Sequence, residues 1–129
     1  MSKALLEIQI TTPDGKSGSV HAVFDSGSFY TLLRQDKVPA GAVVPQLKDA
    51  RVFRTASGTR LTATGELPLV LRIAGREVDD VALISAALTQ EMLVGAGTMQ
   101  KWDISIIHRN ARTEVAVGRD MRDPHINDV

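Results

Sequence analysis

Apolar and polar residues alternate along most of this 129-residue chain, and turn-forming residues interrupt the alternation at regular intervals. Residues 4–10 (ALLEIQI) predict a strand that ends at the turn sequence Thr12-Pro13-Asp14-Gly15. Residues 18–24 (GSVHAVF) predict the second strand of the same hairpin, and residues 29–33 (FYTLL) predict a third strand. Residues 36–50 contain Pro39, Gly41 and Pro45, which predict a loop with a short helical turn.

The second half of the chain repeats this pattern. Residues 50–67 predict two strands that meet at Ser57-Gly58, and residues 67–85 predict a hairpin with Ala74-Gly75 at its turn. The single predicted helix is short, lies within residues 97–104 (GTMQKWDI), and has Thr98 as its predicted N-cap. Two further strands are predicted over residues 104–109 and 113–118. The predicted fold class is therefore mainly β.

Composition limits the classes of function that fit. Hydrophobic residues make up 43% of the chain and charged residues 23%, which is typical of a globular domain that buries a core. Lys and Arg together number 15, as do Asp and Glu, so the formal net charge is zero. This balance argues against a general nucleic-acid or anionic-membrane binder, although residues 101–122 contain several basic residues. The absence of cysteine excludes disulfides, thiol catalysis and thiolate metal sites.

The N-terminal apolar run is short and is broken by Glu7, which does not resemble a signal peptide. No segment approaches the length of a membrane span, so we expect a soluble cytoplasmic protein, unless the chain is an excised domain of a larger one. We predict one domain over residues 1–118, followed by a polar C-terminal tail over residues 119–129.

Several motifs are weaker than they first look. Residues 95–100 (GAGTMQ) begin like a dinucleotide-binding fingerprint but lack its third glycine and the surrounding βαβ unit. The three histidines, at positions 21, 108 and 125, lack metal-ligand spacing and are better interpreted as solvated side chains. The neighbouring acids Asp79 and Asp80 are expected in a surface turn and not as a catalytic pair. No metal site and no cofactor are therefore predicted.

One carboxylate stands apart from these. Asp25 follows an apolar strand directly and opens the turn Asp25-Ser26-Gly27-Ser28, where the desolvation of a charge is costly. The turn is similar to the nucleophile segment of trypsin-like serine proteases, but it lacks the glycine expected after the serine and lies too early in the chain for such a triad. Residues 23–28 (VFDSGS) instead resemble the active-site turn of aspartic proteases.

Later motifs follow in the order found in the retropepsin-like family of aspartic proteases. The family's flap hairpin resembles residues 51–65, with the tip at Ser57-Gly58. Its apolar-apolar-Gly segment before a short helix resembles Leu93-Val94-Gly95. The resemblance covers about residues 4–107 and departs from the family at two positions. Ser28 stands where retroviral members usually have alanine, and Gly97 where many members have a polar or charged residue.

The resemblance implies a closed β-barrel with a flap and one short helix, and Asp25 as the catalytic residue. Because the chain carries a single Asp-Ser-Gly turn, it implies a homodimer in which two Asp25 side chains form the dyad. Gly27 would supply an N–H group to the carboxylate, Ser26 would bond across the dimer, and Ser28 would reach Asp25 of its own chain. The flap would bind an extended polypeptide substrate through five residues: Thr55, Ala56, Ser57, Gly58 and Thr59.

The sequence thus predicts a homodimeric aspartic endopeptidase that acts on extended polypeptides without a metal or cofactor. Two alternatives remain open. The first is a catalytically silent member of the same fold that serves in dimerisation or peptide binding. The second is an unrelated small β-barrel that binds a ligand and carries an Asp-Ser-Gly turn by chance, which predicts a monomer with Asp25 in an exposed loop.

Overall fold

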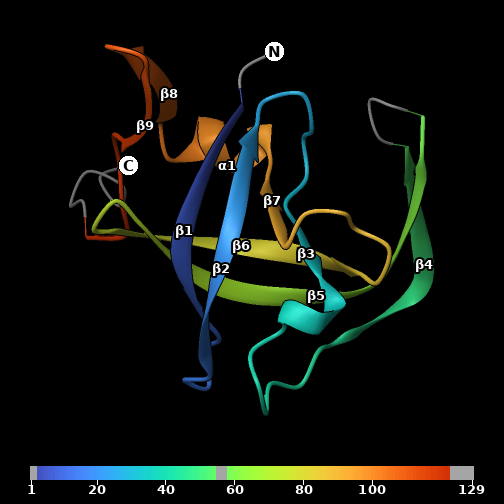
Figure 1. The fold of residues 1–129 in the computed structure, drawn as a ribbon. Helices are drawn as coiled ribbons and strands as arrows, with labels where there is room; N and C mark the ends of the chain where they lie inside the picture. Colours follow the sequence, from blue (N-terminus) through green and yellow to red (C-terminus); the bar gives the residue numbers. More distant parts are fainter. Residues whose placement is uncertain (1–2, 55–57, 123–129) are drawn as a thin grey trace, which may run out of the picture.

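Six strands close into a barrel in the computed structural model of the protein, which describes residues 3–54 and 58–122 (Figure 1). These strands are β1 (Lys3–Thr11), β2 (Ser17–Asp25), β3 (Leu32–Arg34), β5 (Arg60–Ile73), β6 (Arg76–Ser85) and β7 (Met92–Val94). Their order around the barrel is β1-β2-β7-β3-β6-β5. A short antiparallel pairing of β1 with β5, from Gln9↔Arg72 to Thr11↔Val70, closes the sheet on itself. Closure removes the free sheet edges that an open sheet would expose.

The remaining elements extend from this barrel. Strand β4 (Gln46–Arg54) pairs with β5 alone among the described strands, and the two form an arm that stands away from the barrel (Figure 1, right). A 3₁₀ turn, η1 (Gln35–Lys37), follows β3, and the helix α1 (Ala96–Lys101) follows β7. Strands β8 (Ile104–Arg109) and β9 (Arg112–Val117) form a separate hairpin.

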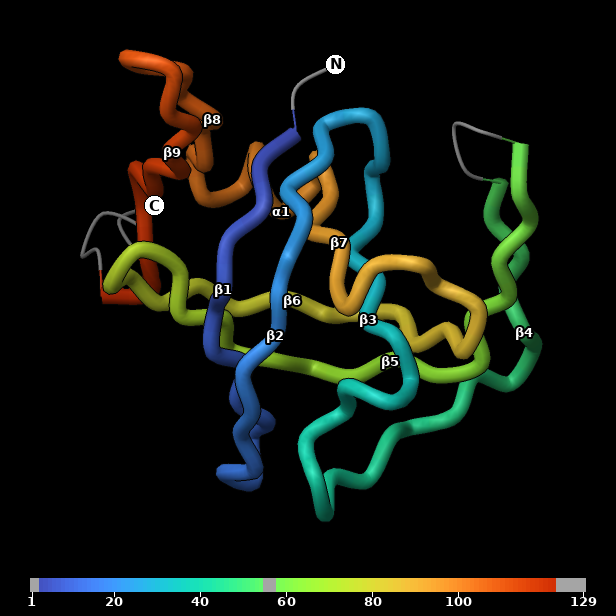
Figure 2. The backbone as a smooth tube through the Cα atoms, in the orientation of Figure 1, coloured from blue at the N-terminus to red at the C-terminus, as the bar shows by residue number. Residues whose placement is uncertain are grey.

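The alternation seen in the sequence decides which side chains fill the barrel. Along most of β5, exposed and buried residues alternate strictly, as expected for a strand with one face on the core. The residues Leu67, Leu69, Leu71 and Ile73 of β5 belong to the main core cluster. Figure 2 shows β1 and β2 crossing in front of β5 and β6, and all four strands contribute side chains to this cluster.

A second, smaller cluster lies at the base of the arm. It consists of Leu32, Leu61, Ala63, Leu83, Leu88 and Leu93, with Leu47 and Phe53 packed against it. Strand β5 therefore contributes to both clusters, its first residues to the smaller one and its later residues to the main core. This shared strand fixes the position of the arm relative to the barrel.

Turn chemistry predicted from the sequence is confirmed at the β5–β6 hairpin. Ala74 and Gly75 have φ values of 51° and 79°, and they connect strands whose last pair is Ile73↔Arg76. Two consecutive residues with positive φ match the right-handed twist of the flanking strands. The predicted strands at residues 4–10, 18–24 and 104–109 are also present, as β1, β2 and β8.

Three local predictions are wrong. Strand β3 comprises only Leu32–Arg34, because the residues before it belong to the turn that begins at Asp25. Strand β4 begins at Gln46, inside the segment predicted as a loop. Thr98 does not cap the helix: Gly95 is the N-cap residue, and Thr98 lies buried within α1.

The first residues of the predicted C-terminal tail pack on the barrel. The backbone N–H of Arg119 donates to the carbonyl of Trp102, and that of Met121 donates to the carbonyl of Glu77. Asp120 is buried, and its carboxylate accepts a hydrogen bond from Nε of Arg76 at 3.1 Å. The domain boundary at residue 118 stays a prediction. Among the helices of residues 3–54 and 58–122, none has the length and apolar character needed to cross a bilayer.

Candidate active site

Asp25 is the last residue of β2 and lies where three strands come together. It is opposite Lys3 of β1, and the preceding residue, Phe24, pairs with Val94 of β7. The parallel pairing of β2 with β7 therefore brings the Asp25 turn beside Gly95, which is about 70 residues away in the sequence. Asp25 is only 8% exposed and lines a cleft, so it does not lie in an open loop.

The turn after Asp25 holds its carboxylate in place. The backbone N–H of Gly27 donates to Oδ1 of Asp25 at 2.9 Å, which confirms the predicted contact. The backbone N–H of Ser28 donates to the carbonyl oxygen of Asp25 at 3.2 Å and closes the turn. A carboxylate that accepts backbone hydrogen bonds is fixed in orientation before any substrate arrives.

The hydroxyl group of Ser28 does not make the predicted contact with Asp25. It donates to the carbonyl oxygen of Tyr30 at 3.2 Å. Since a hydroxyl group has one proton to donate, this bond leaves none for the carboxylate. Ser28 thus supports the loop backbone. Ser26, predicted to bond across a dimer, is exposed in the single chain.

Lys3 supplies the second contact of Asp25, which sequence patterns did not suggest. Its Nζ lies 3.6 Å from Oδ2 of Asp25, while the Lys3 side chain remains about half exposed. The pair follows from the β1–β2 register, in which Lys3 and Asp25 face each other. An ion pair with one exposed partner stabilises the fold only weakly, by about 0–1 kcal/mol.

The first residues of α1 form backbone hydrogen bonds with the turn after Asp25. The backbone N–H groups of Ala96 and Gly97 donate to the carbonyl oxygens of Ser28 and Phe29. Gly95 is required here: a Cβ atom at this position would lie within 2.5 Å of the carbonyl oxygen of Tyr30 and nearer still to that of Phe29. The backbone of the turn approaches the helix too closely for any side chain.

Two threonine hydroxyl groups continue this hydrogen-bond network from Gly95 to β6. Gly95 N–H donates to Oγ1 of Thr31 at 3.2 Å, and Oγ1 of Thr31 lies 3.1 Å from Oγ1 of Thr98. The Thr98 hydroxyl donates in turn to Oδ2 of Asp80 at 2.6 Å. Burial raises the pKa of Asp80 above its ordinary value, and the nearby hydroxyl groups of Thr31 and Thr98 oppose this shift.

The prediction that Asp79 and Asp80 form a surface turn is wrong, because both lie inside β6. Successive side chains of a strand differ in environment, and here Asp79 is exposed while Asp80 is partly buried. Local sequence did not reveal this difference, since the partner of Asp80 comes from α1.

The β4–β5 hairpin stands over the same cleft. Of the five predicted flap residues, Thr55, Ala56 and Ser57 lie outside the described residues. Gly58 is exposed at the described end of the tip, and Thr59 lines the cleft around Asp25. Phe53 and Leu61, on the two strands of the hairpin, line it as well. The hairpin therefore forms one wall of the cleft.

Aromatic contacts connect this hairpin to the Asp25 turn. The ring of Tyr30 lies against that of Phe53, with centroids 5.2 Å apart. The guanidinium carbon of Arg51 lies 4.8 Å from the centroid of Tyr30 and 5.2 Å from that of Phe53. Sequence analysis missed these residues, although aromatic residues directly after the Asp-Ser-Gly turn and within the hairpin were a usable signal.

The cleft around Asp25, called the Asp25 cleft below, has a volume of about 490 Å³. Its walls are largely apolar, with Leu32, Leu61, Leu88 and Leu93 among the lining residues. The charged residues that line it are Lys3, Asp25 and Arg54, so the described part of the chain places one carboxylate there. A single carboxylate can accept a proton from water, but a second group is needed to donate one to a substrate carbonyl.

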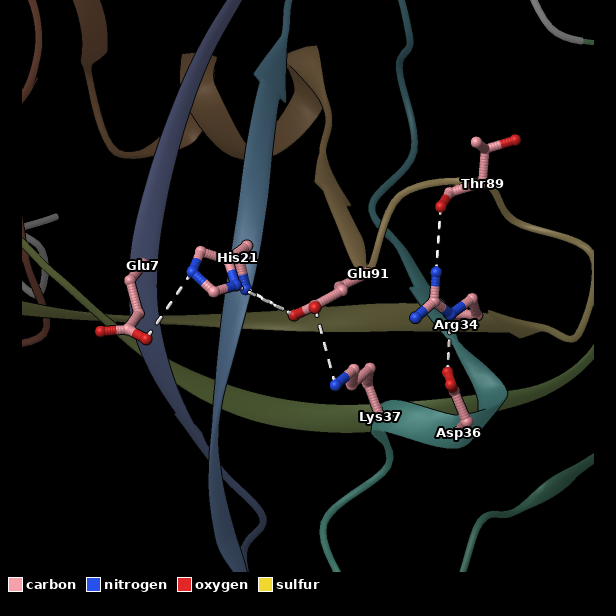
Figure 3. A network of polar contacts seen from close by, with 7 residues as sticks. All are labelled: Glu7, His21, Arg34, Asp36, Lys37, Thr89 and Glu91. Atoms are coloured by element: carbon pink, nitrogen blue, oxygen red, sulfur yellow. Dashed lines mark hydrogen bonds and ion pairs between the residues drawn. The ribbon is translucent and has the colours of Figure 1, made fainter.

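The predicted solvated histidines are outside this cleft where the structure describes them. His21 lies on the outer surface between Glu7 and Glu91, and Lys37 of η1 joins the same network (Figure 3). His108 is exposed beside Thr113, and His125 lies outside the described residues. In residues 3–54 and 58–122, no group of three or more His, Asp or Glu side chains is arranged to hold a metal ion.

Solved structures with a similar backbone include a retroviral protease and a retroviral protease-like domain. The protease of EIAV, in complex with the inhibitor HBY-793, is 11% identical in sequence and has a TM-score of 0.59, covering 82% of this chain and 93% of that chain. The retroviral protease-like domain of Ddi1 from Leishmania major is 13% identical and has a TM-score of 0.56, covering 93% of this chain and 98% of that domain.

No protein-family model matches the sequence, and no curated protein sequence matches it. At identities this low the structural likeness shows the fold, and it shows that this chain has a retropepsin-like fold. The predicted fold class, a mainly β closed barrel with one small helix, is confirmed.

Proposed function

We propose that this protein is an aspartic endopeptidase whose active unit is a homodimer. The observation that carries the proposal is the environment of the Asp25 carboxylate. Its carboxylate accepts the Gly27 amide at the floor of an apolar cleft, under a hairpin, on a retropepsin-like fold. The fold alone does not imply activity, so the proposal depends on this site geometry.

The chemistry needs two carboxyl groups close together. Two such groups that share one proton carry one negative charge between them. In aspartic proteases the ionised carboxylate of such a pair acts as the base and the protonated one as the acid. In the proposed dimer, the carboxylate of one Asp25 takes a proton from water while the other carboxylic acid donates its proton to the peptide carbonyl oxygen. The resulting diol then breaks its C–N bond: the Asp25 that took up the water proton donates it to the nitrogen, a diol hydroxyl returns its proton to the other Asp25, and a carboxylic acid and an amine are released.

The β4–β5 hairpin is proposed as the flap. Thr59 and Phe53 line the Asp25 cleft, so closure of this hairpin would cover an extended peptide lying across Asp25. The leucine-rich walls of the cleft favour apolar side chains on either side of the scissile bond. In this proposal Ser26, which is exposed and follows Asp25 directly, bonds to its counterpart in the second chain.

Hydrolysis of a diverse peptide pool tests this function. We expect the wild-type protein to cleave a subset of peptides and Asp25→Asn to lose at least about 100-fold of that rate, the usual effect of a central acid–base group. Asp49→Asn is the matched control, because Asp49 is an exposed carboxylate on β4. Sedimentation of all three proteins gives their mass at the assay concentration.

The outcomes separate the alternatives. A dimer that cleaves nothing supports the catalytically silent module. A protein that stays monomeric at every concentration contradicts the shared dyad, whatever its activity. Cleavage that survives Asp25→Asn within about tenfold of wild type would show that another group does the chemistry.

A further inference from the structure

A second cleft, called the outer cleft below, lies on the outside of the barrel, beside strands β5 and β6 and the helix α1. Its volume is about 580 Å³, within the range of ligand-binding pockets. Strands β5 and β6 form its floor, with Pro68, Val70 and Val81 facing it, and α1 forms one wall through Thr98 and Lys101. None of these residues lines the Asp25 cleft.

Exposed apolar side chains gather at the outer cleft. Seven large apolar side chains are exposed among the described residues, and four of them line it: Phe29, Tyr30, Val81 and Met121. Phe29 is 61% exposed and Val81 48%. Isolated apolar residues on a surface need no explanation, but a contiguous group around a cleft marks a binding surface.

The outer cleft also holds one uncompensated carboxylate. Asp79 is paired with Lys101, whose Nζ lies 3.3 Å from its Oδ1. Asp80 accepts hydrogen bonds from the Thr98 hydroxyl and the Val81 amide, and no basic side chain of residues 3–54 or 58–122 forms an ion pair with it. Because burial disfavours the ionised form of Asp80, a cation brought into the cleft would stabilise that form.

Aromatic faces in the outer cleft favour the same ligand chemistry. The ring of Trp102 already holds the ammonium group of Lys101 at 5.0 Å from its centroid. Phe29 offers a further ring, which packs edge to face with that of Tyr30. A cation with an apolar stem, such as an arginine or lysine side chain, satisfies both the rings and the carboxylate.

Phe29 and Tyr30 connect the two clefts. Both residues line the Asp25 cleft as well as the outer cleft, so they form a ridge between them. A peptide that lies in the Asp25 cleft and crosses these two residues would therefore reach the outer cleft. The charges of the two clefts differ in sign: Lys3 and Arg54 outnumber Asp25 in one, and Asp80 is unpaired in the other.

We propose that the outer cleft is a docking site for a flanking segment of the polypeptide substrate, with an arginine or lysine side chain against Asp80 and apolar neighbours on Phe29, Val81 and Met121. This inference rests on the proposed peptidase function. It assigns to the substrate a basic residue among apolar ones, outside the segment that contacts Asp25.

Binding to the inactive Asp25→Asn protein tests the docking site. The probes are fluorescein-labelled peptides with an apolar central segment and a Leu-Arg-Leu extension at one end or the other, and matched peptides with Leu-Gln-Leu. For one of the two extensions we expect the Arg peptide to bind about tenfold more tightly than its Gln partner, equivalent to one charge-assisted hydrogen bond. Asp80→Asn in the same protein should reduce this ratio to near one, and the control Asp49→Asn should retain it.

A second variant guards against a folding defect in Asp80→Asn. Val81→Lys changes an exposed side chain in the outer cleft, and its positive charge should lower the affinity for the Arg peptide but not for the Gln peptide. Equal affinities of Arg and Gln peptides at both ends, or an Arg preference that survives both substitutions, would overturn the docking site. The Arg preference could also be lost in both variants while the protein with Asp25 intact cleaves no peptide. That result would contradict the peptidase proposal and leave the outer cleft as a peptide-binding site.

Discussion

The ring of Tyr30 packs against the ring of Phe53, with centroids 5.2 Å apart, and so joins the loop after Asp25 to the β4–β5 hairpin. The guanidinium group of Arg51 lies over both rings. These contacts join the floor and one wall of the Asp25 cleft, whose backbones are otherwise held by different strand pairings.

Replacement of Arg51 by methionine tests this junction. Methionine keeps the apolar stem but removes the cation, which is worth roughly 0.5–1 kcal/mol at an exposed aromatic site. We expect amide hydrogen exchange in the β4–β5 hairpin to become roughly two- to fivefold faster, with the barrel strands unaffected. Lys48→Met is the control, since Lys48 lies exposed on the same strand. Equal exchange rates in all three proteins would show that Arg51 contributes nothing to the junction.

Gly95→Ala should damage the Asp25 turn through sterics alone. The added methyl group meets the backbone carbonyls of Phe29 and Tyr30, which cannot move without disturbing the turn. Overpacking of this kind typically costs about 1–3 kcal/mol, which urea unfolding would measure. Gly18→Ala on β2 is a matched control, because a Cβ atom there meets nothing within 4 Å. Similar unfolding midpoints for both variants would contradict the close approach at Gly95.

Ser28→Ala separates two roles for the Ser28 hydroxyl. Because that hydroxyl donates to the carbonyl of Tyr30, its loss should lower the free energy of unfolding by about 0.5–1.5 kcal/mol. The pH–rate curve of the proposed peptidase should keep its shape after scaling. A displaced acid limb would instead mean that the hydroxyl turns towards the dyad in the active dimer.

Ser26→Ala tests the proposed assembly. Loss of a hydrogen bond between subunits, worth about 1 kcal/mol, should raise the dimer dissociation constant about fivefold for each bond removed. On dilution, Ser26→Ala should therefore begin to lose specific activity at a higher protein concentration than wild type does. Sedimentation over the same dilution series distinguishes weak dimerisation from a direct effect on hydrolysis. Identical dissociation constants would remove Ser26 from the interface.

Asp120 gives the fold a pH dependence of known sign. The hydrogen bond from Arg76 holds the pKa of Asp120 below its ordinary value of 3.8, so ionised Asp120 stabilises the folded state. This contribution is present above pH 3.8 and is lost as the pH falls through the lower, folded-state pKa. Asp120→Asn should therefore be less stable than wild type at neutral pH and equally stable in strong acid. Thermal unfolding across the acid range measures the difference, and a constant difference at every pH would contradict the ion pair.

The sequence by itself determined most of the strands and the turn that follows Asp25. Alternation along residues 60–73 is sufficient to predict which residues of β5 face the core, and Ala74-Gly75 predicts the hairpin turn. The contact from Gly27 to Asp25 also followed from the Asp-Ser-Gly motif. All of these depend on residues close together in the chain, whose backbone preferences and side-chain periodicity act locally.

Only the tertiary structure decided which of these elements support the site. The motif suggested that the Ser28 hydroxyl reaches Asp25, but the loop directs it to Tyr30. Threonine is a common N-cap residue, yet the packing of α1 against β6 makes Thr98 a hydrogen-bond partner of Asp80. The contact of Lys3 with Asp25 depends on strand register and that of Tyr30 with Phe53 on the packing of the hairpin. Closure of the barrel brings such residues together across long separations in sequence, and local periodicity carries no information about those distances.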